Sequence, residues 1–486
     1  MPKSIKTNYI FNLINTISSL IFPVLTFPYA SRIMLAEGIG QVNFYQSIIQ
    51  YISLFTCLGI PMYAIREIAK VRDNPYECNK TTLEILLLHF SLTFLGYLLV
   101  FILCLLIPEI QVNIPLFLIL STSILFTTIG CEWFYQGIED FKYITIRGLI
   151  VKISALFILF ICVKTPQDIL WYGMYCVVGV VGGNIFNFIR LKKYISFISF
   201  KQLNPLKHLK PALRIFVLNL IISLYVNLNS VMLGFIKNTE SVGLFTAATR
   251  LSQMILGVTS ALGTVMLPRL TNLLSNQQKE EFNRLAQKAT EFIFAISLPI
   301  TVGTIILAPE LIILFCGSTY HAAITTLQLI SPIIVLISLS GILGIQILYP
   351  QGKENIVIIC TAIGAASNFI LNLCLVPSLS QDGAAIATLV AEFLVTFSMM
   401  LIGRKYIPIN WKSKSFLNYC IGTAIMAFVI VPITLTSNTN SIISLIACIA
   451  TGIIIYAIYL GLTKDKLYYT FKDFLTKKRS RPEIPL

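Results

Sequence analysis

The stretch SLIFPVLTFPYASRIMLAEGIG, residues 19–40, decides the kind of fold, because it is apolar almost throughout and carries its first charge at Arg32. A helix needs about 20 apolar residues to cross the roughly 30 Å hydrocarbon core of a bilayer. No water solvates the backbone there, so its N–H and C=O groups must pair within the segment, as they do in a helix. The stretch therefore predicts a membrane-spanning helix with an arginine near one end.

The composition of the whole chain also indicates a membrane protein. Of its 486 residues 56% are hydrophobic and only 12% are charged, and the mean hydropathy is +0.82. These values lie far outside the soluble range. We predict an all-α integral membrane protein with about 14 transmembrane helices, whose apolar segments are 9–35, 41–64, 83–107, 115–138, 146–163, 169–190, 214–236, 243–267, 289–315, 323–348, 357–377, 384–402, 416–435 and 441–463. The first segment is too long for a cleaved signal peptide, so we expect the chain to keep it.

The positions of Lys and Arg predict the orientation, because basic residues in short loops resist translocation. If the N-terminus and every second loop share one side, that side holds 31 of the 36 Lys and Arg. The other side holds Arg32, Lys164 and Lys237, while Lys152 and Arg250 fall inside apolar segments. We therefore expect a multi-pass membrane protein with both termini in the cytoplasm.

Charge, loops and motifs exclude several classes of function. The net charge of +15 lies in loops that face anionic lipids, which argues against nucleic-acid binding. The outer loops are short, for example PEIQVNI and KTPQD, and leave no room for a catalytic domain. The Gly-Lys pair in YPQGKEN lacks the first glycine of a phosphate-binding loop. The 11 cysteines form no metal-ligand or disulfide pattern. We expect a transporter with no enzymatic activity, cofactor or metal.

An internal repeat predicts two halves. AEGIGQVNFYQS (36–47) matches TESVGLFTAAT (239–249), which places Glu37 opposite Glu240 and Gly40 opposite Gly243. We predict two pseudo-symmetric six-helix lobes with a substrate path between them, as in alternating-access transporters. The expected organisation is an N-lobe at 1–200, a C-lobe at 201–405, two extra C-terminal helices at 406–463 and a basic cytoplasmic tail at 464–486.

Five stretches together resemble the polysaccharide transporter (Wzx-type) flippases of the multidrug/oligosaccharidyl-lipid/polysaccharide (MATE-like) exporter superfamily. They are FPYASRIMLAEGIGQVNF (27–44), EWFYQGIEDFKYITIR (132–147), NLNSVMLGFIKNTESVGLFTAATR (227–250), QILYPQGKEN (346–355) and AIGAASNFILNLCLVPSLSQDGAAIATLVAE (362–392). The resemblance implies a flippase that moves undecaprenyl-diphosphate-linked oligosaccharide repeat units to the outer leaflet for capsule, O-antigen or exopolysaccharide assembly. It also implies a location in the bacterial plasma (inner) membrane and membrane lipids as partners, with the polysaccharide polymerase and chain-length machinery as further candidates.

A diphosphate that changes leaflets needs a counter-charge in a low-dielectric site, and arginine stays protonated and can bind phosphate through two N–H groups. Arg250 is the stronger candidate, because it lies roughly 10 Å into its segment, too deep for easy contact with the headgroups. Arg32 is the second candidate, although it lies near the outer end of its helix and could reach the headgroups instead. We predict that these two residues bind the diphosphate.

Asparagines at helical spacing are weaker candidates for binding sugar. Asn12 and Asn15 share one face of the first segment, and Asn368 and Asn372 share one face of the eleventh. The alternative role is hydrogen bonding between helices, which is common for asparagine in membranes.

Three further residues are candidates for coupling to H⁺ or Na⁺, or for ion pairs. Glu132 and Glu392 are acids in apolar surroundings. The alternative role of Glu132 is an ion pair with a nearby Lys or Arg. The alternative roles of Lys152 are contact with the headgroups or an ion pair with Glu132, Glu139 or Asp140.

Other functions stay open at this point. A cation-coupled drug exporter of the same superfamily is one alternative, although the first segment lacks the acid that such exporters commonly use. A lipid II flippase is a close variant. A membrane glycosyltransferase or polymerase is disfavoured by the short outer loops.

Overall fold

The computed structural model describes residues 5–196, 198–436 and 442–463, and these residues form helices and connecting loops without a β-strand. In chain order the helical elements are α1 (Ile5–Cys57), α2 (Ile60–Val71), α3 (Pro75–Leu106), α4 (Pro108–Gln111), α5 (Ile114–Gly130), α6 (Glu132–Gly137), α7 (Phe141–Phe157), η1 (Ile158–Cys162), η2 (Pro166–Asp168), α8 (Ile169–Val181), α9 (Asn184–Leu191), η3 (Phe200–Gln202), η4 (Pro205–His208), α10 (Leu209–Ile236), α11 (Thr239–Ser275), α12 (Lys279–Ile306), α13 (Ala308–Cys316), η5 (Ser318–Tyr320), α14 (Ala323–Ile330), α15 (Ile333–Gly341), η6 (Ile342–Leu348), η7 (Tyr349–Gln351), α16 (Glu354–Ile402), α17 (Lys414–Thr436) and α18 (Ile442–Leu462).

Among the described residues, nine helices are long and apolar enough to cross a membrane, and α8 with α9 makes a tenth if this pair, bent by 47°, is one span. The predicted all-α membrane fold is confirmed, and the chain is a multi-pass membrane protein. Two of the nine helices, 21–71 and 354–402, each cover two predicted segments. The number fourteen stays a prediction.

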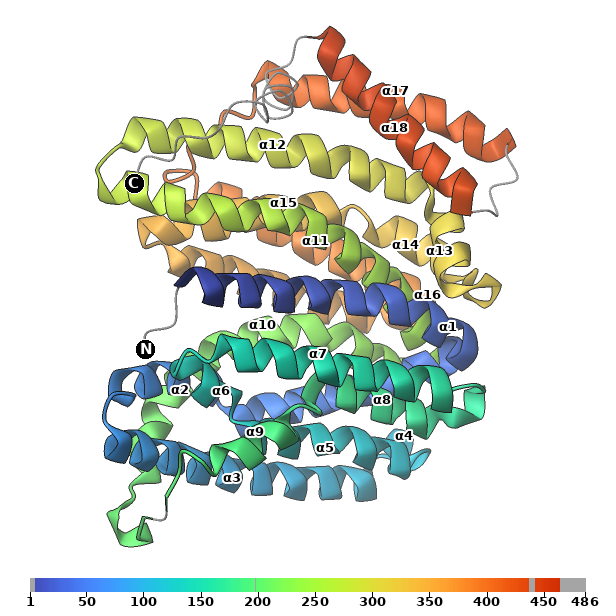
Figure 1. The fold of residues 1–486 in the computed structure, drawn as a ribbon. Coiled ribbons are helices and arrows are strands. Elements are labelled where there is room, and N and C mark those ends of the chain that lie inside the picture. Colours follow the sequence, from blue (N-terminus) through green and yellow to red (C-terminus); the bar gives the residue numbers. More distant parts are fainter. Residues whose placement is uncertain (1–4, 197, 437–441, 464–486) are drawn as a thin grey trace. The chain divides into compact units, whose positions relative to one another are not determined.

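Both of these long helices break where the sequence predicts a loop. Helix α1 breaks at Leu35, which has a left-handed φ of 57°, and α16 breaks at Ser380, which has a φ of 52°. Figure 1 shows α1, in dark blue, turning back on itself at its labelled end. The predicted separations between segments 9–35 and 41–64, and between 357–377 and 384–402, lie at these two breaks.

Two predicted boundaries were wrong. Segment 41–64 is interrupted, because α1 ends at Cys57 and Gly59 adopts a φ of 73° before α2 begins. A Cβ atom on Gly59 would lie 2.6 Å from the carbonyl oxygen of Ala212, so only glycine fits this turn. Segment 289–315 is also two helices, because α12 ends at Ile306 and α13 starts a new helix that has proline in its first turn.

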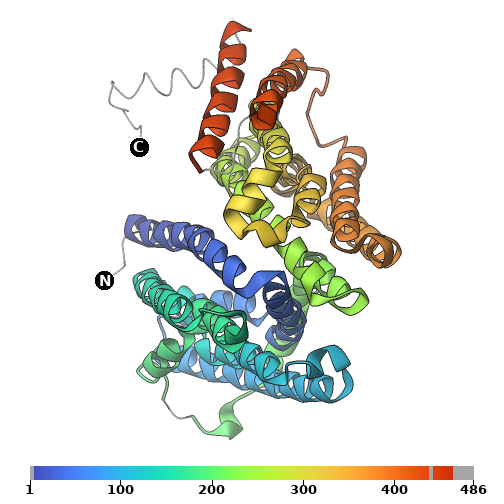
Figure 2. The same cartoon turned by 90° about the vertical axis from the view of Figure 1, so that its right-hand side faces the viewer.

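The helices group into two compact units. The first comprises Met1–Thr246 and Phe369–Ala384, and the second comprises Ala247–Asn368 and Ala385–Leu486. Helix α10 belongs to the first unit, where it packs against α1 and α2. Figure 2 shows residues 1–246 of the first unit, coloured blue to green, turned by 90° from the view in Figure 1. The six-helix lobes at 1–200 and 201–405 stay a prediction.

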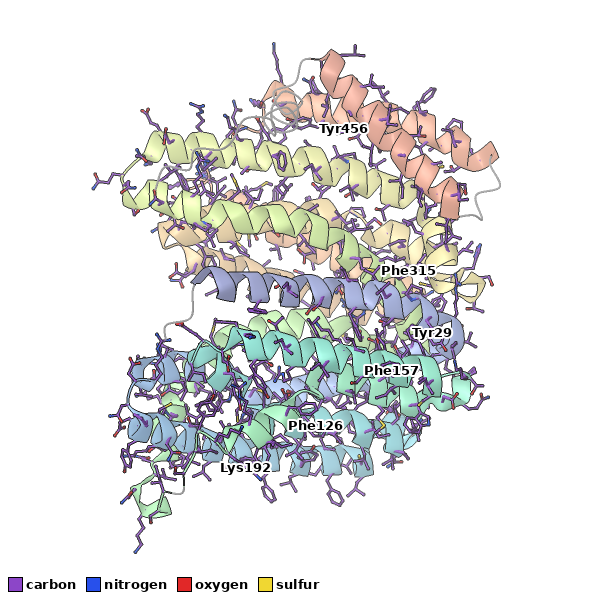
Figure 3. All side chains as sticks on the ribbon, viewed as in Figure 1. Tyr29, Phe126, Phe157, Lys192, Phe315 and Tyr456 are labelled. Atoms are coloured by element: carbon purple, nitrogen blue, oxygen red, sulfur yellow. The ribbon has the colours of Figure 1, made fainter. Side chains whose placement is uncertain are left out.

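Ion pairs in the first unit gather several basic loops at one end of its helices. The guanidinium of Arg72 lies 2.7 Å from Glu139, and that of Arg190 lies 2.7 Å from Asp140. These contacts join the α2–α3 turn and α9 to the α6–α7 turn. Lys192, labelled in Figure 3, follows α9 at this end. We call it the basic end, and it is the end that the distribution of Lys and Arg predicts to face the cytoplasm.

The second unit is built around α12. Its buried apolar side chains pack with those of α11, η6 and α16. The last two helices, α17 and α18, pack on α12 as well: the Phe416 ring lies 5.2 Å from that of Phe294, and the Tyr456 hydroxyl donates to the Ala295 carbonyl oxygen at 2.8 Å. The expected C-terminal helix pair is therefore part of this unit.

Candidate functional site

The two candidate diphosphate ligands lie in different units. Arg32 is an exposed residue of α1 in the first unit, three positions before the break at Leu35. Arg250 lies in α11 in the second unit, where it is half-buried. Among the described residues Arg250 has no hydrogen-bond or ion-pair partner. A guanidinium that is partly removed from solvent and not neutralised attracts an anion.

Glu132 forms an ion pair with Arg147. Nη2 of Arg147 donates to Oε2 of Glu132 at 2.8 Å, and the side chain of Arg147 is 9% exposed while that of Glu132 is 41% exposed. Because α6 begins at Glu132 and α7 carries Arg147 in its second turn, the pair joins the ends of two consecutive helices near the basic end.

Lys152 contacts hydroxyl groups and not the carboxylates that the sequence offered. Its ammonium donates to Oγ of Ser18 at 2.7 Å and to Oγ of Ser19 at 2.8 Å. Glu132, Glu139 and Asp140 each pair with an arginine instead. Lys152 therefore connects α7 with the first half of α1.

The asparagine candidates divide into two groups. Asn12 and Asn15 belong to α1, but their side chains lie outside the described residues. Asn368 and Asn372 are fully buried in α16. Nδ2 of Asn372 donates to Oδ1 of the buried Asn229 at 2.8 Å, so this asparagine makes a hydrogen bond between α16 and α10.

Glu392 is 7% exposed and lies in the part of α16 that belongs to the second unit. Among the described residues, no group of three or more His, Cys, Asp or Glu side chains could hold a metal ion.

Sequence reasoning missed a buried polar cluster at the basic end of the first unit. The carboxylate of Glu84 in α3 is fully buried, and it accepts from the Asn204 N–H at 2.9 Å and lies 2.5 Å from Nζ of Lys207. It also lies 3.1 Å from Nε2 of His208, whose Nδ1 lies 2.7 Å from the Tyr63 hydroxyl. The only signal in the sequence was an acid two residues into the apolar segment 83–107.

A neutral imidazole is compatible with the surroundings of His208. A neutral ring satisfies both contacts, because Nε2–H donates to Glu84 while Nδ1 accepts from the Tyr63 hydroxyl. Burial lowers the pKa of His208, although the carboxylate of Glu84 acts in the opposite direction. Lys207, His208 and Asn204 thus hold the loop between α9 and α10 against α3.

Comparison with known proteins identifies the chain's relatives. The model of the family described as "Polysaccharide biosynthesis protein" matches residues 5–274, more than half of the chain. The protein of Escherichia coli (strain K12) named "Putative O-antigen transporter" is 27% identical over 405 residues, which cover 82% of this chain and 97% of that protein.

Two solved structures share the fold. A structure of the lipid II flippase MurJ in an inward closed conformation has a TM-score of 0.75 at 18% identity and covers 94% of this chain and 99% of that one. An inward-facing MATE family multidrug transporter has a TM-score of 0.62 at 14% identity and covers 82% and 98%. The resemblance that the sequence predicts is confirmed, and the chain belongs to the family described as "Polysaccharide biosynthesis protein", with the fold of the MurJ and MATE proteins.

Proposed function

We propose that this protein is a flippase that moves undecaprenyl-diphosphate-linked oligosaccharide repeat units from the cytoplasmic to the outer leaflet of a bacterial plasma membrane, for O-antigen, capsule or exopolysaccharide assembly. Family membership and the near full-length match to a protein named as an O-antigen transporter support this substrate class. The chain acts as a transporter and not as an enzyme.

The observation that carries the proposal is the half-buried, unpaired guanidinium of Arg250 among the described residues. Its guanidinium is half-buried in α11 and has no ion-pair partner among the described residues. A charge in this position costs free energy unless an anion compensates it, and a lipid diphosphate supplies two phosphate groups. Arg250 is therefore the leading candidate ligand of the diphosphate during transport, and Arg32 of α1 is the second candidate.

Five other residues are weaker candidates for a role in transport. Asn12, Asn15, Asn368 and Asn372 are the candidate sugar ligands, and Glu392 is the candidate for coupling to H⁺ or Na⁺, because it is an acid buried in a membrane-spanning helix. In this proposal both termini face the cytoplasm, and the polymerase and chain-length proteins receive the product on the outer side.

A lipid II flippase is the second candidate. A protein of Rhizobium tropici named "Probable lipid II flippase MurJ" is 29% identical over 193 residues, 38% of this chain and 36% of that protein. The lipid heads of both candidate substrates have the same diphosphate chemistry.

Complementation in cells tests the proposal. The chain is expressed in one bacterial strain that lacks its O-antigen flippase and in another that is depleted of its lipid II flippase. Surface polysaccharide in the first strain and no rescue of growth in the second is the expected result. Rescue of the second strain alone would assign the lipid II function, and failure in both strains despite membrane insertion would contradict the proposal.

A further inference from the structure

Buried polar atoms without a hydrogen-bond partner gather at one corner of the first unit. Nε and Nη1 of Arg147 have no partner among the described residues, although this side chain is only 9% exposed. Both amide atoms of Asn187, which is fully buried, also lack a hydrogen-bond partner among the described residues, and so does the hydroxyl oxygen of Tyr143. Such groups are costly to bury unless a ligand or water satisfies them.

Shared neighbours and helix positions place these three residues near one another. Arg147 lies against Gly183, where a Cβ atom would be 3.0 Å from Nε of the guanidinium. Asn187 follows one turn later, and its N–H donates to the carbonyl oxygen of Gly183 at 3.3 Å. Tyr143 precedes Arg147 by one turn of α7, so both side chains lie on the same face of this helix.

Tyr135 of α6 completes the corner. Its hydroxyl donates to the carbonyl oxygen of Asn187 at 2.7 Å, and its ring lies 5.1 Å from that of Tyr143. Helices α6, α7 and α9 therefore meet around the unpartnered atoms of Arg147, Asn187 and Tyr143. We call these three residues the Arg147 corner.

Donors outnumber acceptors in the Arg147 corner. The unpartnered nitrogens of Arg147 carry three N–H groups, the amide of Asn187 carries two and the hydroxyl of Tyr143 one, against two acceptors, the amide oxygen of Asn187 and the hydroxyl oxygen of Tyr143. Arg190, which lies 3.9 Å from the centre of the Tyr143 ring, adds positive charge, although Asp140 pairs with it. A phosphate group, which presents several acceptor oxygens and negative charge, complements this set.

The ion pair of Arg147 shows where such a group would enter. Glu132 is 41% exposed while Arg147 is buried, so the carboxylate lies on the accessible side of the guanidinium. A phosphate oxygen that replaces this carboxylate conserves the charge balance of the pair. Glu132 can turn towards solvent, whereas Arg147 is held against Gly183.

We propose that the Arg147 corner is a phosphate-binding subsite, and that a phosphate group of the ligand displaces Glu132 from Arg147. This inference rests on the proposed function, because it takes the phosphate bound in the Arg147 corner to be part of the lipid diphosphate. The subsite binds one phosphate group of the substrate with residues of the first unit alone.

Opposite effects of substitutions at the two partners test the proposal. The probes are inorganic pyrophosphate and farnesyl diphosphate, titrated against the purified full-length protein in nanodiscs. Glu132→Gln removes the competing charge and should tighten binding of both probes by about tenfold. Arg147→Lys keeps the charge but loses the fork of N–H donors and should weaken binding by about tenfold.

Two further variants keep the test decisive. Tyr143→Phe removes one donor and should weaken binding by a few fold, even if Arg147→Lys fails to fold. Glu139→Gln removes an equal charge from the ion pair with Arg72 at the same end of the unit and should leave binding unchanged. Equal affinity in the wild type, Glu132→Gln and Tyr143→Phe would overturn the proposal and assign the corner to a structural ion pair with buried water.

The two probes separate the sources of phosphate. Tighter binding of farnesyl diphosphate than of pyrophosphate indicates a lipid head, and equal binding indicates a soluble phosphate compound. If complementation fails but Glu132→Gln still tightens binding, the subsite stands and the proposed function falls. If complementation succeeds and no variant changes binding, only the subsite is contradicted.

Discussion

Gly40 of α1 and Gly243 of α11 pack against each other's helix in a reciprocal way. A Cβ atom on Gly40 would overlap the carbonyl oxygen of Thr239 and lie 2.7 Å from the backbone nitrogen of Gly243, and a Cβ atom on Gly243 would overlap the carbonyl oxygen of Ala36. The pairs Ala36 with Gly243 and Gly40 with Thr239 are related by the same offset of 203 residues that the sequence repeat shows. This symmetry supports the repeat, and it explains why both positions are glycine.

Substitution of either glycine should destabilise the protein. Gly40→Ala and Gly243→Ala each push a methyl group into backbone, which costs about 1–3 kcal/mol when neighbouring atoms cannot move. Thermal unfolding of the purified variants measures the effect. Gly303→Ala and Gly341→Ala are matched controls, because a Cβ atom at these helical positions meets no atom within 4 Å. A melting temperature for Gly40→Ala equal to that of Gly303→Ala would contradict the packing argument.

Glu84 should hold the loop between α9 and α10 in place. Glu84→Ala removes an acceptor shared by Asn204, Lys207 and His208 and should lower the free energy of unfolding by about 2 kcal/mol. Trypsin should then cleave the loop faster at Lys201 and Lys207. The control is Glu77→Ala near the start of the same helix, where the expected cost is below about 1 kcal/mol. Unchanged cleavage in Glu84→Ala would show that the cluster does not hold the loop.

His208 should make stability depend on pH. Burial lowers its pKa in the folded protein below the usual 6.5, so the unfolded chain binds more protons as the pH falls. This contribution to stability is complete above pH 6.5 and is lost progressively below it. The free energy of unfolding, measured between pH 8 and pH 5, should fall with a smaller slope in His208→Gln than in the wild type. An identical slope in both proteins would mean that His208 titrates alike in the folded and unfolded states.

The hydrogen bond between Asn372 and Asn229 separates a packing role from sugar binding. A double-mutant cycle of Asn372→Ala and Asn229→Ala should give a coupling energy of about 0.6 kcal/mol, which is typical of hydrogen bonds between membrane helices. Stability in detergent is the quantity to measure. No coupling, together with lost transport by Asn372→Ala, would favour the sugar-binding role.

The sequence predicted those features that depend on local composition. Hydropathy alone predicts the membrane helices, because each helix satisfies its own backbone, and the polar residues near Leu35 and Ser380 predict the breaks in α1 and α16. The break at Gly59 was not predicted, because its cause is the backbone of Ala212.

Contacts between distant residues account for what the sequence could not predict at the candidate site. The partners of Glu84 lie at least 120 positions away, and the serines that bind Lys152 lie more than 130 positions away. The sequence offered Glu132 several basic partners, and the packing of Arg147 against Gly183 decides which of them is near enough.

Reconstituted transport is the most direct test of the central claim that Arg250 binds the diphosphate head of a lipid-linked oligosaccharide as the protein moves it across the membrane. Liposomes carrying the purified protein and a labelled polyprenyl-diphosphate oligosaccharide report how much label reaches the other leaflet. The account predicts transport by the wild type and none by Arg250→Ala, which should keep the melting temperature of the wild type because Arg250 has no partner to lose among the described residues. Transport by Arg250→Ala at the wild-type rate would contradict the account.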